Sequence, residues 1–179
     1  MVAKGFPQVH GQDHFEVYAP VGRHVSLRAI IAHAIIRDQD IEQTDVSTAF
    51  MNADLEEAVY MSLPPSIKAR RIRDNMIETY LDFEQPNSKT NFVALLRKSV
   101  NGLKQSGRNW SHELHNTLTS IGFKRSLIDS CLYSWSKPSG VLWLVVFVDD
   151  MVYTGNKEHI KEFKHAIEQR YKVARETTH

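Results

Sequence analysis

The sequence has a single cysteine, no long apolar run and almost no excess of charge of either sign. Because Cys131 stands alone, an internal disulfide and a cysteine-based zinc site are both excluded, and a reducing compartment is favoured. The longest apolar run, Val141–Val148, is far too short to span a bilayer, and the first residues lack the apolar core of a signal peptide. We therefore expect an intracellular protein with no membrane partner.

The charge balance gives no global sign of a polyanionic partner. Lysine and arginine total 22 against 21 aspartates and glutamates, so any surface that binds nucleic acid must be local. One basic cluster, formed by Lys68, Arg70, Arg71 and Arg73, either follows a phosphate backbone or is a solvated helix face. With 179 residues, 42% of them hydrophobic, the chain can bury one core, or one core and a smaller lobe.

The most informative stretch is Val141–Gly155, in which two apolar runs flank Asp149 and Asp150. Short runs rich in β-branched and aromatic residues predict a β-hairpin with the two acids at its tip. One interpretation is an exposed Asp-Asp turn, because acids form turns well and strands poorly. The other is a rigid hairpin that holds two carboxylates at the rim of a cleft, where they would bind Mg²⁺. The second interpretation needs a third carboxylate from elsewhere in the chain.

Periodicity and turn residues predict the remaining elements. Helices are expected over residues 26–37, with Ser26 as the cap, from about residue 108 to Gly122, and from Asn156 to about Tyr171. Strands are expected at about residues 2–6, 41–46, 91–97 and 131–135, the last pairing with the strand from Val141. Residues 54–64 are expected to form a turn of helix that runs into a short extended segment, and residues 174–179 a frayed tail.

Several short motifs follow one another in the order of a polymerase palm. They are Val2-Ala-Lys-Gly-Phe-Pro-Gln8, Gln43-Thr-Asp-Val-Ser-Thr-Ala-Phe-Met-Asn52, Gly102-Leu-Lys-Gln105 with Arg108 and Trp110, and Phe147-Val-Asp-Asp150. Each motif is weak alone, but in this order and spacing they resemble the reverse transcriptase of copia-type LTR retrotransposons. The resemblance covers residue 2 to about residue 172.

The resemblance implies an α+β fold, a polymerase palm in which helices back an antiparallel sheet, with a partial fingers subdomain. The whole chain, 1–179, would be one partial reverse transcriptase domain. Fingers-like parts would cover 1–24 and about 58–105, and the palm about 25–57 and 106–173. The chain is expected to be a fragment of a polyprotein or a decayed copy of the element, which begins inside the first fingers strand and stops before the thumb and the RNase H domain.

The resemblance also implies RNA-directed DNA polymerase chemistry with two Mg²⁺ ions, for which Mn²⁺ could substitute. Asp45, Asp149 and Asp150 would be the catalytic metal ligands. Carboxylates from two different strands are what a pair of ions needs, because the ions must bracket the attacking hydroxyl and the leaving pyrophosphate. Phe147, which stands where the family usually has tyrosine, would support the hairpin.

Four further residues take expected roles from the same resemblance. Phe50 would lie under the incoming sugar and exclude a 2′-hydroxyl, and Gln105 would lie against the incoming nucleotide. Lys104 and Arg108 would either contact phosphates or form structural salt bridges. The implied partners are an RNA or DNA template with its primer, dNTPs, and the missing thumb and RNase H portions. A cytoplasmic particle and the nucleus both remain open as locations.

Two other functions are alternatives to polymerase activity. The first is a catalytically inactive retrotransposon remnant that folds and at most binds nucleic acid weakly. The second is phosphoryl transfer through Asp45 as a nucleophile, which is excluded because no second acid stands two residues later to act as general acid.

Overall fold

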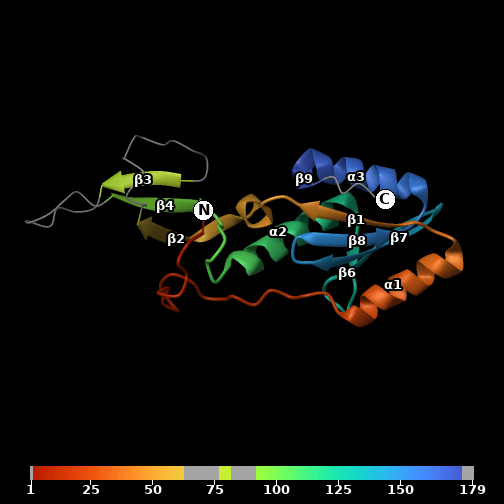
Figure 1. Cartoon of the computed structure of the whole chain (residues 1–179), viewed down its shortest axis with the longest axis horizontal. Coiled ribbons are helices and arrows are strands. Elements are labelled where there is room, and N and C mark those ends of the chain that lie inside the picture. The colour runs from red at the N-terminus through yellow and green to blue at the C-terminus, as the bar shows by residue number, and fades with distance from the viewer. Residues whose placement is uncertain (1, 63–76, 82–91, 175–179) are drawn as a thin grey trace, which may run out of the picture. The chain divides into compact units, whose positions relative to one another are not determined.

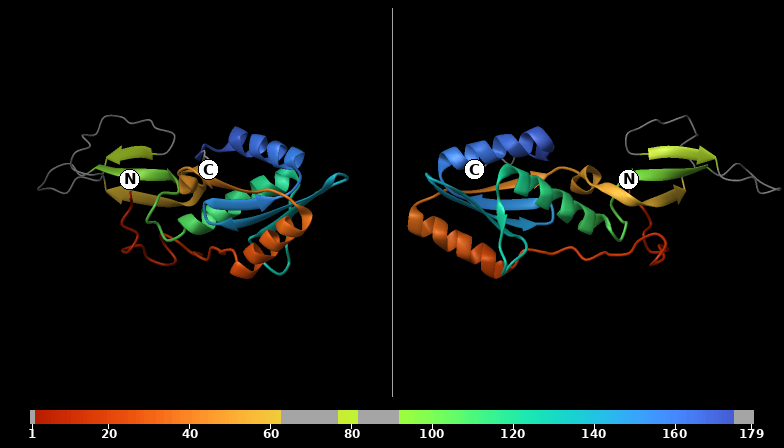
Figure 2. Two further views of the ribbon diagram at one scale, coloured as in Figure 1. Left: turned by 45° about the vertical axis from the view of Figure 1, so that its right-hand side comes forward. Right: turned by 180° about the vertical axis from the view of Figure 1, so that it is seen from behind.

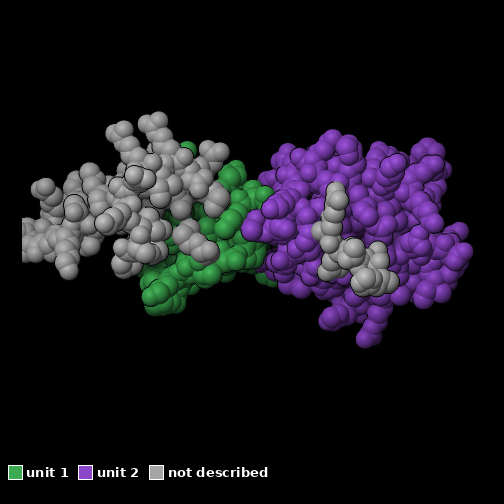
Figure 3. Space-filling model, turned by 45° about the horizontal axis from the view of Figure 1, so that its top comes forward, with its two compact units in different colours: residues 1–18, 50–110 green, residues 19–49, 111–179 purple. Residues whose placement is uncertain are grey.

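The structure is a computed structural model that describes residues 2–62, 77–81 and 92–174. It divides into two compact units, which Figure 3 shows in different colours. Unit 1 comprises Met1–Tyr18 and Phe50–Trp110, and unit 2 comprises Ala19–Ala49 and Ser111–His179. Within the described residues, no helix is long and apolar enough to cross a membrane.

Unit 2 is built on a six-stranded antiparallel sheet with the order β5-β6-β7-β8-β1-β9 (Figure 1). These strands are β1 (Ile41–Val46), β5 (Lys124–Arg125), β6 (Leu132–Lys137), β7 (Gly140–Phe147), β8 (Asp150–Thr154) and β9 (Val173–Ala174). Helix α1 (His24–Arg37) lies on one face of the sheet and α3 (Lys157–Arg170) on the other, as the views in Figure 2 show. Helix α2 (Ser106–Ile121) contributes its residues from Ser111 onward to this unit.

The core of unit 2 lies between the sheet and α3. Tyr153 of β8 is fully buried, and its ring stands 4.9 Å from that of Phe163 in α3. Phe123, which follows α2, packs against Phe163 at 5.4 Å and against Trp135 of β6 at the same centroid distance. Large aromatic side chains bury much apolar area at little entropic cost, so this cluster fixes α3 against the central strands.

Unit 1 contains a three-stranded antiparallel sheet with the order β2-β4-β3. Its strands are β2 (Asp54–Ser62), β3 (Ile77–Leu81) and β4 (Phe92–Lys98), and a 3₁₀ turn, η1 (Ala49–Asn52), precedes β2. Buried apolar residues of this unit form a cluster that consists of Ala3, Val59, Leu96, Val100 and Leu103.

The structure confirms the coarse α+β class, the three predicted helices and most predicted strands. Three local predictions were wrong. No strand forms at residues 2–6, where the backbone is irregular and Gly5 lies against the backbone of Gly102. Residues 54–62 form strand β2 rather than a turn of helix, because pairing with β4 overrides the helix propensity of the Leu-Glu-Glu-Ala stretch. Ser26 is not the cap of α1, because its hydroxyl donates to Asp129 while Arg23 occupies the cap position.

Two predictions fall on parts of the chain that the structure does not describe. The basic cluster formed by Lys68, Arg70, Arg71 and Arg73 lies outside the described residues, as does the tail after Ala174.

Candidate active site

Asp45 and Asp150, far apart in the sequence, face each other on neighbouring strands of unit 2. The antiparallel register of β1 and β8 places Asp45 directly opposite Asp150. Directly opposed residues in an antiparallel pair point to the same face of the sheet, with Cβ atoms about 4.5–5.5 Å apart. Both residues are half-buried at the end of their strands. Two carboxylates therefore share one face at one end of the sheet.

Asp149 lies at the same end of the sheet, in the two-residue turn between β7 and β8. Its backbone carbonyl accepts a hydrogen bond of 3.1 Å from the amide of Val46, the last residue of β1. Its side chain is exposed. The hairpin and the end of β1 are thus tied together by main-chain geometry, which brings all three predicted acids to one edge of one unit.

The donor set suits a hard divalent cation, although the side chains do not form a ready-made cage. Two facing carboxylates offer the oxygen ligands that Mg²⁺ prefers. Like charges directly opposite each other on a sheet are destabilising, and a cation between Asp45 and Asp150 would relieve that repulsion. Within the described part of the chain, however, no three His, Cys, Asp or Glu side chains lie close enough to hold a metal ion. Asp45 and Asp150 therefore fit a cation as a pair, and Asp149 would have to turn its exposed side chain toward them.

The turn that carries Asp149 has an unusual backbone. Val148 has a φ of 57°, in the left-handed region that β-branched residues very rarely adopt. A positive φ at the first residue of a two-residue hairpin turn is a feature of type II′, where glycine is usual. Holding valine there costs on the order of 1–3 kcal/mol, and strain of this kind gathers at functional sites. The surrounding sheet therefore enforces the position of Asp149 against a local preference.

Gln43 lies on the same face as the carboxylates, a position that no sequence motif assigned to the site. Its side-chain amide donates a hydrogen bond of 3.0 Å to Oδ1 of Asp150. Because side chains alternate along a strand, Gln43 and Asp45 point to the same face of β1. The two-residue step from Gln43 to Asp45 was the signal that could have identified it. Gln43 therefore orients one carboxylate of the pair.

The opposite face of β1 and β8 is anchored in the interior. The hydroxyl groups of Thr44 and Tyr153, both buried, lie 2.7 Å apart in a hydrogen bond. Burial raises the pKa of Tyr153 to about 12, although the bond to Thr44 acts in the other direction. The tyrosine therefore stays neutral at physiological pH. Gln43 and Asp45 flank Thr44 in β1, and their side chains therefore point to the carboxylate face. The hydrogen bond between Thr44 and Tyr153 thus sets the direction of both side chains.

The segment that precedes α1 closes on the hairpin from the carboxylate side. Phe147 pairs with Asp150 across the hairpin, and the ring of His24 lies 6.3 Å from the Phe147 ring. A Cβ atom added at Gly22 would stand 2.7 Å from the carbonyl oxygen of Val146 and 3.0 Å from the Phe147 ring. Only glycine allows this approach, so Gly22 brings the chain into contact with the base of the hairpin tip.

The residues predicted to contact the nucleotide belong to unit 1. Phe50 is half-buried in η1. Gln105 is fully buried, and its amide is engaged on both sides: it accepts from the Gln8 side chain at 3.0 Å and donates to the Asp13 carbonyl at 2.9 Å. In this conformation Gln105 joins the N-terminal segment to the start of α2.

The two basic residues near Gln105 are also engaged within unit 1. The ammonium group of Lys104 donates to the Gln8 carbonyl at 2.9 Å, and its side chain is exposed. Arg108 forms an ion pair of 3.0 Å with Glu16. An exposed pair of this kind contributes little to stability and is easily exchanged for another anion.

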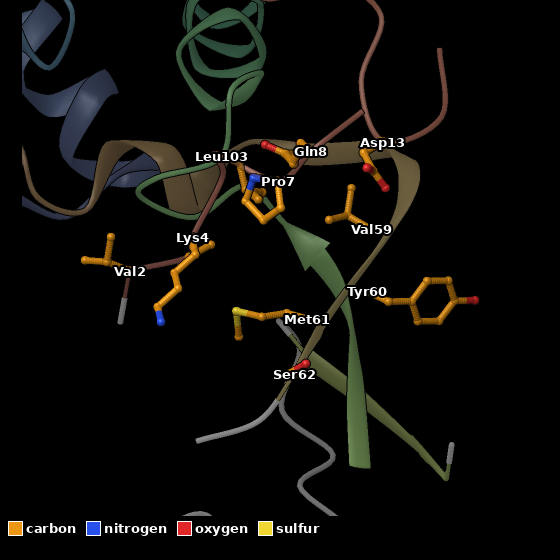
Figure 4. A pocket seen from close by; sticks show the side chains of 11 residues that line it. Val2, Lys4, Pro7, Gln8, Asp13, Val59, Tyr60, Met61, Ser62 and Leu103 are labelled. Carbon is orange, nitrogen blue, oxygen red and sulfur yellow. The ribbon is translucent and has the colours of Figure 1, made fainter. Parts of the chain in front are cut away.

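Unit 1 also contains a pocket of about 660 Å³ between the N-terminal segment and β2 (Figure 4). Its wall is mostly apolar, with the Lys4 side chain, the Gln8 amide and the Asp13 carboxylate as polar groups. Tyr60 stands at its edge with its ring turned outward, 58% exposed. None of the predicted site residues is among the described residues that line this pocket.

Comparison with known proteins places the chain in a family. The family model described as reverse transcriptase (RNA-dependent DNA polymerase) matches residues 1–177. The Pol polyproteins of the Arabidopsis thaliana transposons RE1 and RE2 are 36% and 34% identical to it over 87% and 97% of the chain. The Nicotiana tabacum transposon TNT 1-94 polyprotein is 32% identical over 87%. The chain spans only 10–11% of the length of these relatives. No solved structure gives a significant match.

The matched region includes β1, η1, the β7–β8 hairpin and the segment from Gly102 to Trp110, which are the parts of the chain that carry the predicted site residues. The protein therefore belongs to the reverse transcriptase family of copia-type transposon Pol polyproteins.

Proposed function

We propose that unit 2 carries the active site of an RNA-directed DNA polymerase, which transfers a nucleotide from a dNTP to the 3′-hydroxyl of a primer. The observation that carries the proposal is the register that sets Asp45 opposite Asp150, with Asp149 in the adjoining turn. A fixed sheet is a suitable support, because nucleotidyl transfer depends almost entirely on positioning and charge stabilisation.

In this proposal Asp45, Asp149 and Asp150 hold two divalent cations, Mg²⁺ or in its place Mn²⁺. When bound, the ions would favour deprotonation of the primer hydroxyl and balance the charge of the leaving pyrophosphate. The chain's own residues fix the ligands. Gln43 orients Asp150 through its hydrogen bond, and the strained turn at Val148 sets the position of Asp149.

The nucleotide site in this proposal is formed by residues of unit 1. Phe50 lies under the sugar, where its ring leaves no room for a 2′-hydroxyl. Gln105 lies against the nucleotide after its amide is released from Gln8 and Asp13. Lys104 and Arg108 then neutralise phosphate charge, Arg108 by exchanging the exposed carboxylate of Glu16 for a phosphate.

The proposed partners are an RNA or DNA template with its primer, dNTPs, and the thumb and RNase H portions of a Pol polyprotein. Sequence-independent affinity for a duplex comes mainly from neutralised phosphates. The chain has a net charge of only +1. By itself it should bind a primer–template in the weak nonspecific range, with a Kd of about 10⁻⁴–10⁻⁶ M at physiological salt.

A second candidate is a non-catalytic remnant that folds and at most binds nucleic acid weakly. The observation that favours it is that no three acidic or other ligand side chains stand within metal-binding distance in the part of the chain that the structure describes. In this case the family fold would persist while the third ligand, Asp149, never joins the pair.

Primer extension separates the two candidates. The chain alone and the chain joined to the thumb of a copia-type relative are given a primer on an RNA template, one dNTP and Mg²⁺. We expect extension near background for the chain alone and metal-dependent addition for the joined protein. The matched variant is Asp150→Asn, which retains an oxygen that can accept the Gln43 hydrogen bond. If the joined protein is no more active than this variant, the chain is a remnant.

A further inference from the structure

Helix α1 presents an apolar stripe to solvent. Val25, Ala29, Ala32 and Ile36 are all exposed, Val25 by 74% and Ile36 by 81%. They follow one another at steps of four, three and four residues, the spacing of a coiled-coil seam. The sheet-facing side of α1, in contrast, buries Ser26, Ile30 and Ala34. Apolar side chains scattered singly on a surface need no explanation, but a stripe along three turns does.

The charged side chains within α1 are all positive, and the exposed Asp38 follows directly after the helix. Helix α1 contains no aspartate or glutamate, and its arginines, Arg28 and Arg37, are exposed. Arg28 precedes Ala29 and therefore lies at a position that flanks the seam. Among the described residues, neither arginine forms an ion pair with a carboxylate of the chain. Arg28 thus borders the stripe with a positive charge that no carboxylate of the described residues compensates.

A second exposed apolar segment lies next to the first turn of α1. Asp129 accepts hydrogen bonds from the Ser26 hydroxyl at 2.5 Å and the Arg23 amide at 3.1 Å, which ties the loop before β6 to the start of the helix. The two residues before Asp129 are among the most exposed apolar residues described: Leu127 is 104% exposed and Ile128 80%. Exposed apolar side chains therefore stand both on the helix and in the loop that is tied to its first turn.

We propose that the outward face of α1, defined by Val25, Ala29, Ala32 and Ile36, is the docking site for an amphipathic helix whose apolar stripe is flanked by carboxylates. The two central alanines leave a shallow strip in which the side chains of a partner helix can sit as knobs. Glutamates or aspartates beside the partner's stripe would meet Arg28, which flanks the seam. Complementary charge of this kind selects the partner more than it adds raw affinity.

Other occupants fit the face less well. A second copy of the chain would bring α1 against α1 and place arginines near arginines. A phosphate backbone would meet the arginines but leave Val25 and Ile36 in water. A bilayer surface is bound through buried apolar area, to which Ala29 and Ala32 add little.

The test uses two synthetic helical peptides of about three heptads, with leucine at every a and d position. One peptide carries glutamate at every e and g position, and the matched peptide carries lysine there. Fluorescence anisotropy measures the binding of each labelled peptide to the full chain. We expect saturable binding of the glutamate peptide and roughly tenfold or more weaker binding of the lysine peptide, since like charges disfavour the wrong partner.

Three variants locate the binding site. Ala29→Glu combined with Ala32→Glu should abolish binding, and both changes suit an exposed helix position, so the fold is retained. Asn116→Glu adds a single negative charge at an exposed position of α2 and should leave binding unchanged. Arg28→Glu should weaken binding of the glutamate peptide and strengthen that of the lysine peptide. Circular dichroism verifies that each variant is folded.

Four results would overturn the proposal. The first is equal binding of the two peptides, and the second is binding that persists in the double alanine variant. The third is concentration-dependent dimerisation in sedimentation equilibrium that the double variant abolishes, which would assign the face to a second copy. The fourth is binding to phosphatidylserine vesicles that depends on Val25 and Ile36, which would assign it to a membrane surface.

Discussion

Replacing Asp150 by asparagine should stabilise the metal-free protein. Asp45 and Asp150 are opposed on neighbouring strands and half-buried. Two unit charges at the typical Cβ separation of an opposed pair, about 5 Å, repel by about 1 kcal/mol in water and about 3 kcal/mol at an effective dielectric constant of 20. Partial exposure favours the lower figure, and the asparagine oxygen keeps the bond from Gln43. We expect a gain of about 1 kcal/mol, which raises Tm by about 2–4 °C in a chain of this size.

Mg²⁺ should reverse the order of stability of the wild type and Asp150→Asn. At about ten times its dissociation constant, Mg²⁺ bound by the native protein contributes about 1.4 kcal/mol, or about 3–6 °C in Tm. Asp150→Asn lacks one ligand of the facing pair and should gain little. The wild type is therefore the less stable protein without Mg²⁺ and the more stable one with it.

Thermal unfolding followed by circular dichroism measures both effects, with ionic strength held constant by NaCl when Mg²⁺ is omitted. Glu168→Gln, which removes an exposed carboxylate of α3, is the matched control and should respond to Mg²⁺ as the wild type does. The reasoning is refuted if Asp150→Asn is less stable than the wild type without metal, or if all three proteins gain equally from Mg²⁺.

Four further predictions concern single residues. Gln43→Leu removes the hydrogen bond that orients Asp150, so the Mg²⁺-dependent rise in Tm should be smaller than in the wild type. An equal rise would show that Gln43 does not orient this metal ligand. Gly22→Ala should lower the unfolding free energy by about 1–3 kcal/mol in urea titration, because the added Cβ meets a backbone oxygen of β7 at 2.7 Å; no change would mean that the segment moves freely. Burial alone would raise the pKa of Asp129, but its hydrogen bonds and a nearby arginine hold the pKa below the usual value. The ionised carboxylate of Asp129 therefore stabilises the folded protein at a pH above the usual pKa, and this stabilisation is lost as the pH falls through the folded pKa. Acid titration should therefore show a steeper loss of stability below about pH 4 in the wild type than in Asp129→Asn. Phe50→Ala, in the protein joined to a thumb, should increase ribonucleotide incorporation relative to deoxyribonucleotide incorporation, and unchanged discrimination would make Phe50 a core residue.

The sequence predicts best where one physical signal dominates. The β7–β8 hairpin follows from two apolar runs around a polar pair, and α3 follows from Ile160, Phe163 and Ile167, all of which are buried. The predicted tip, Asp149 and Asp150, is one residue too late: the turn consists of Val148 and Asp149, and Asp150 already begins β8 opposite Phe147.

The failures lie where long-range contacts decide the local structure. Residues 54–62 contain good helix formers and become a strand only because β4 pairs with them. The irregular N-terminal segment is held by the bond from the Ala3 amide to the Asn101 carbonyl, nearly a hundred residues away. Strand β9 is two residues long, and only its pairing with Asp45 and Val46 defines it.

In the candidate site, too, some residues could be predicted from the sequence and others depend on long-range contacts. The carboxylates could be proposed from the sequence because the resemblance assigns them, and their common face follows from strand alternation and register. The role of Gln43, the strain at Val148 and the contact of Gly22 with the hairpin depend on three-dimensional packing that no local pattern encodes.

The location of bound Mn²⁺ tests the central claim most directly. Crystals of the chain soaked in Mn²⁺ and a dNTP would show the ions by their anomalous scattering. We predict two peaks about 3.5–4 Å apart at the end of β1 and β8, within ligand distance of Asp45, Asp149 and Asp150, and their loss in Asp150→Asn. Peaks elsewhere, or none at this edge while Asp45 and Asp150 remain ordered, would contradict the account.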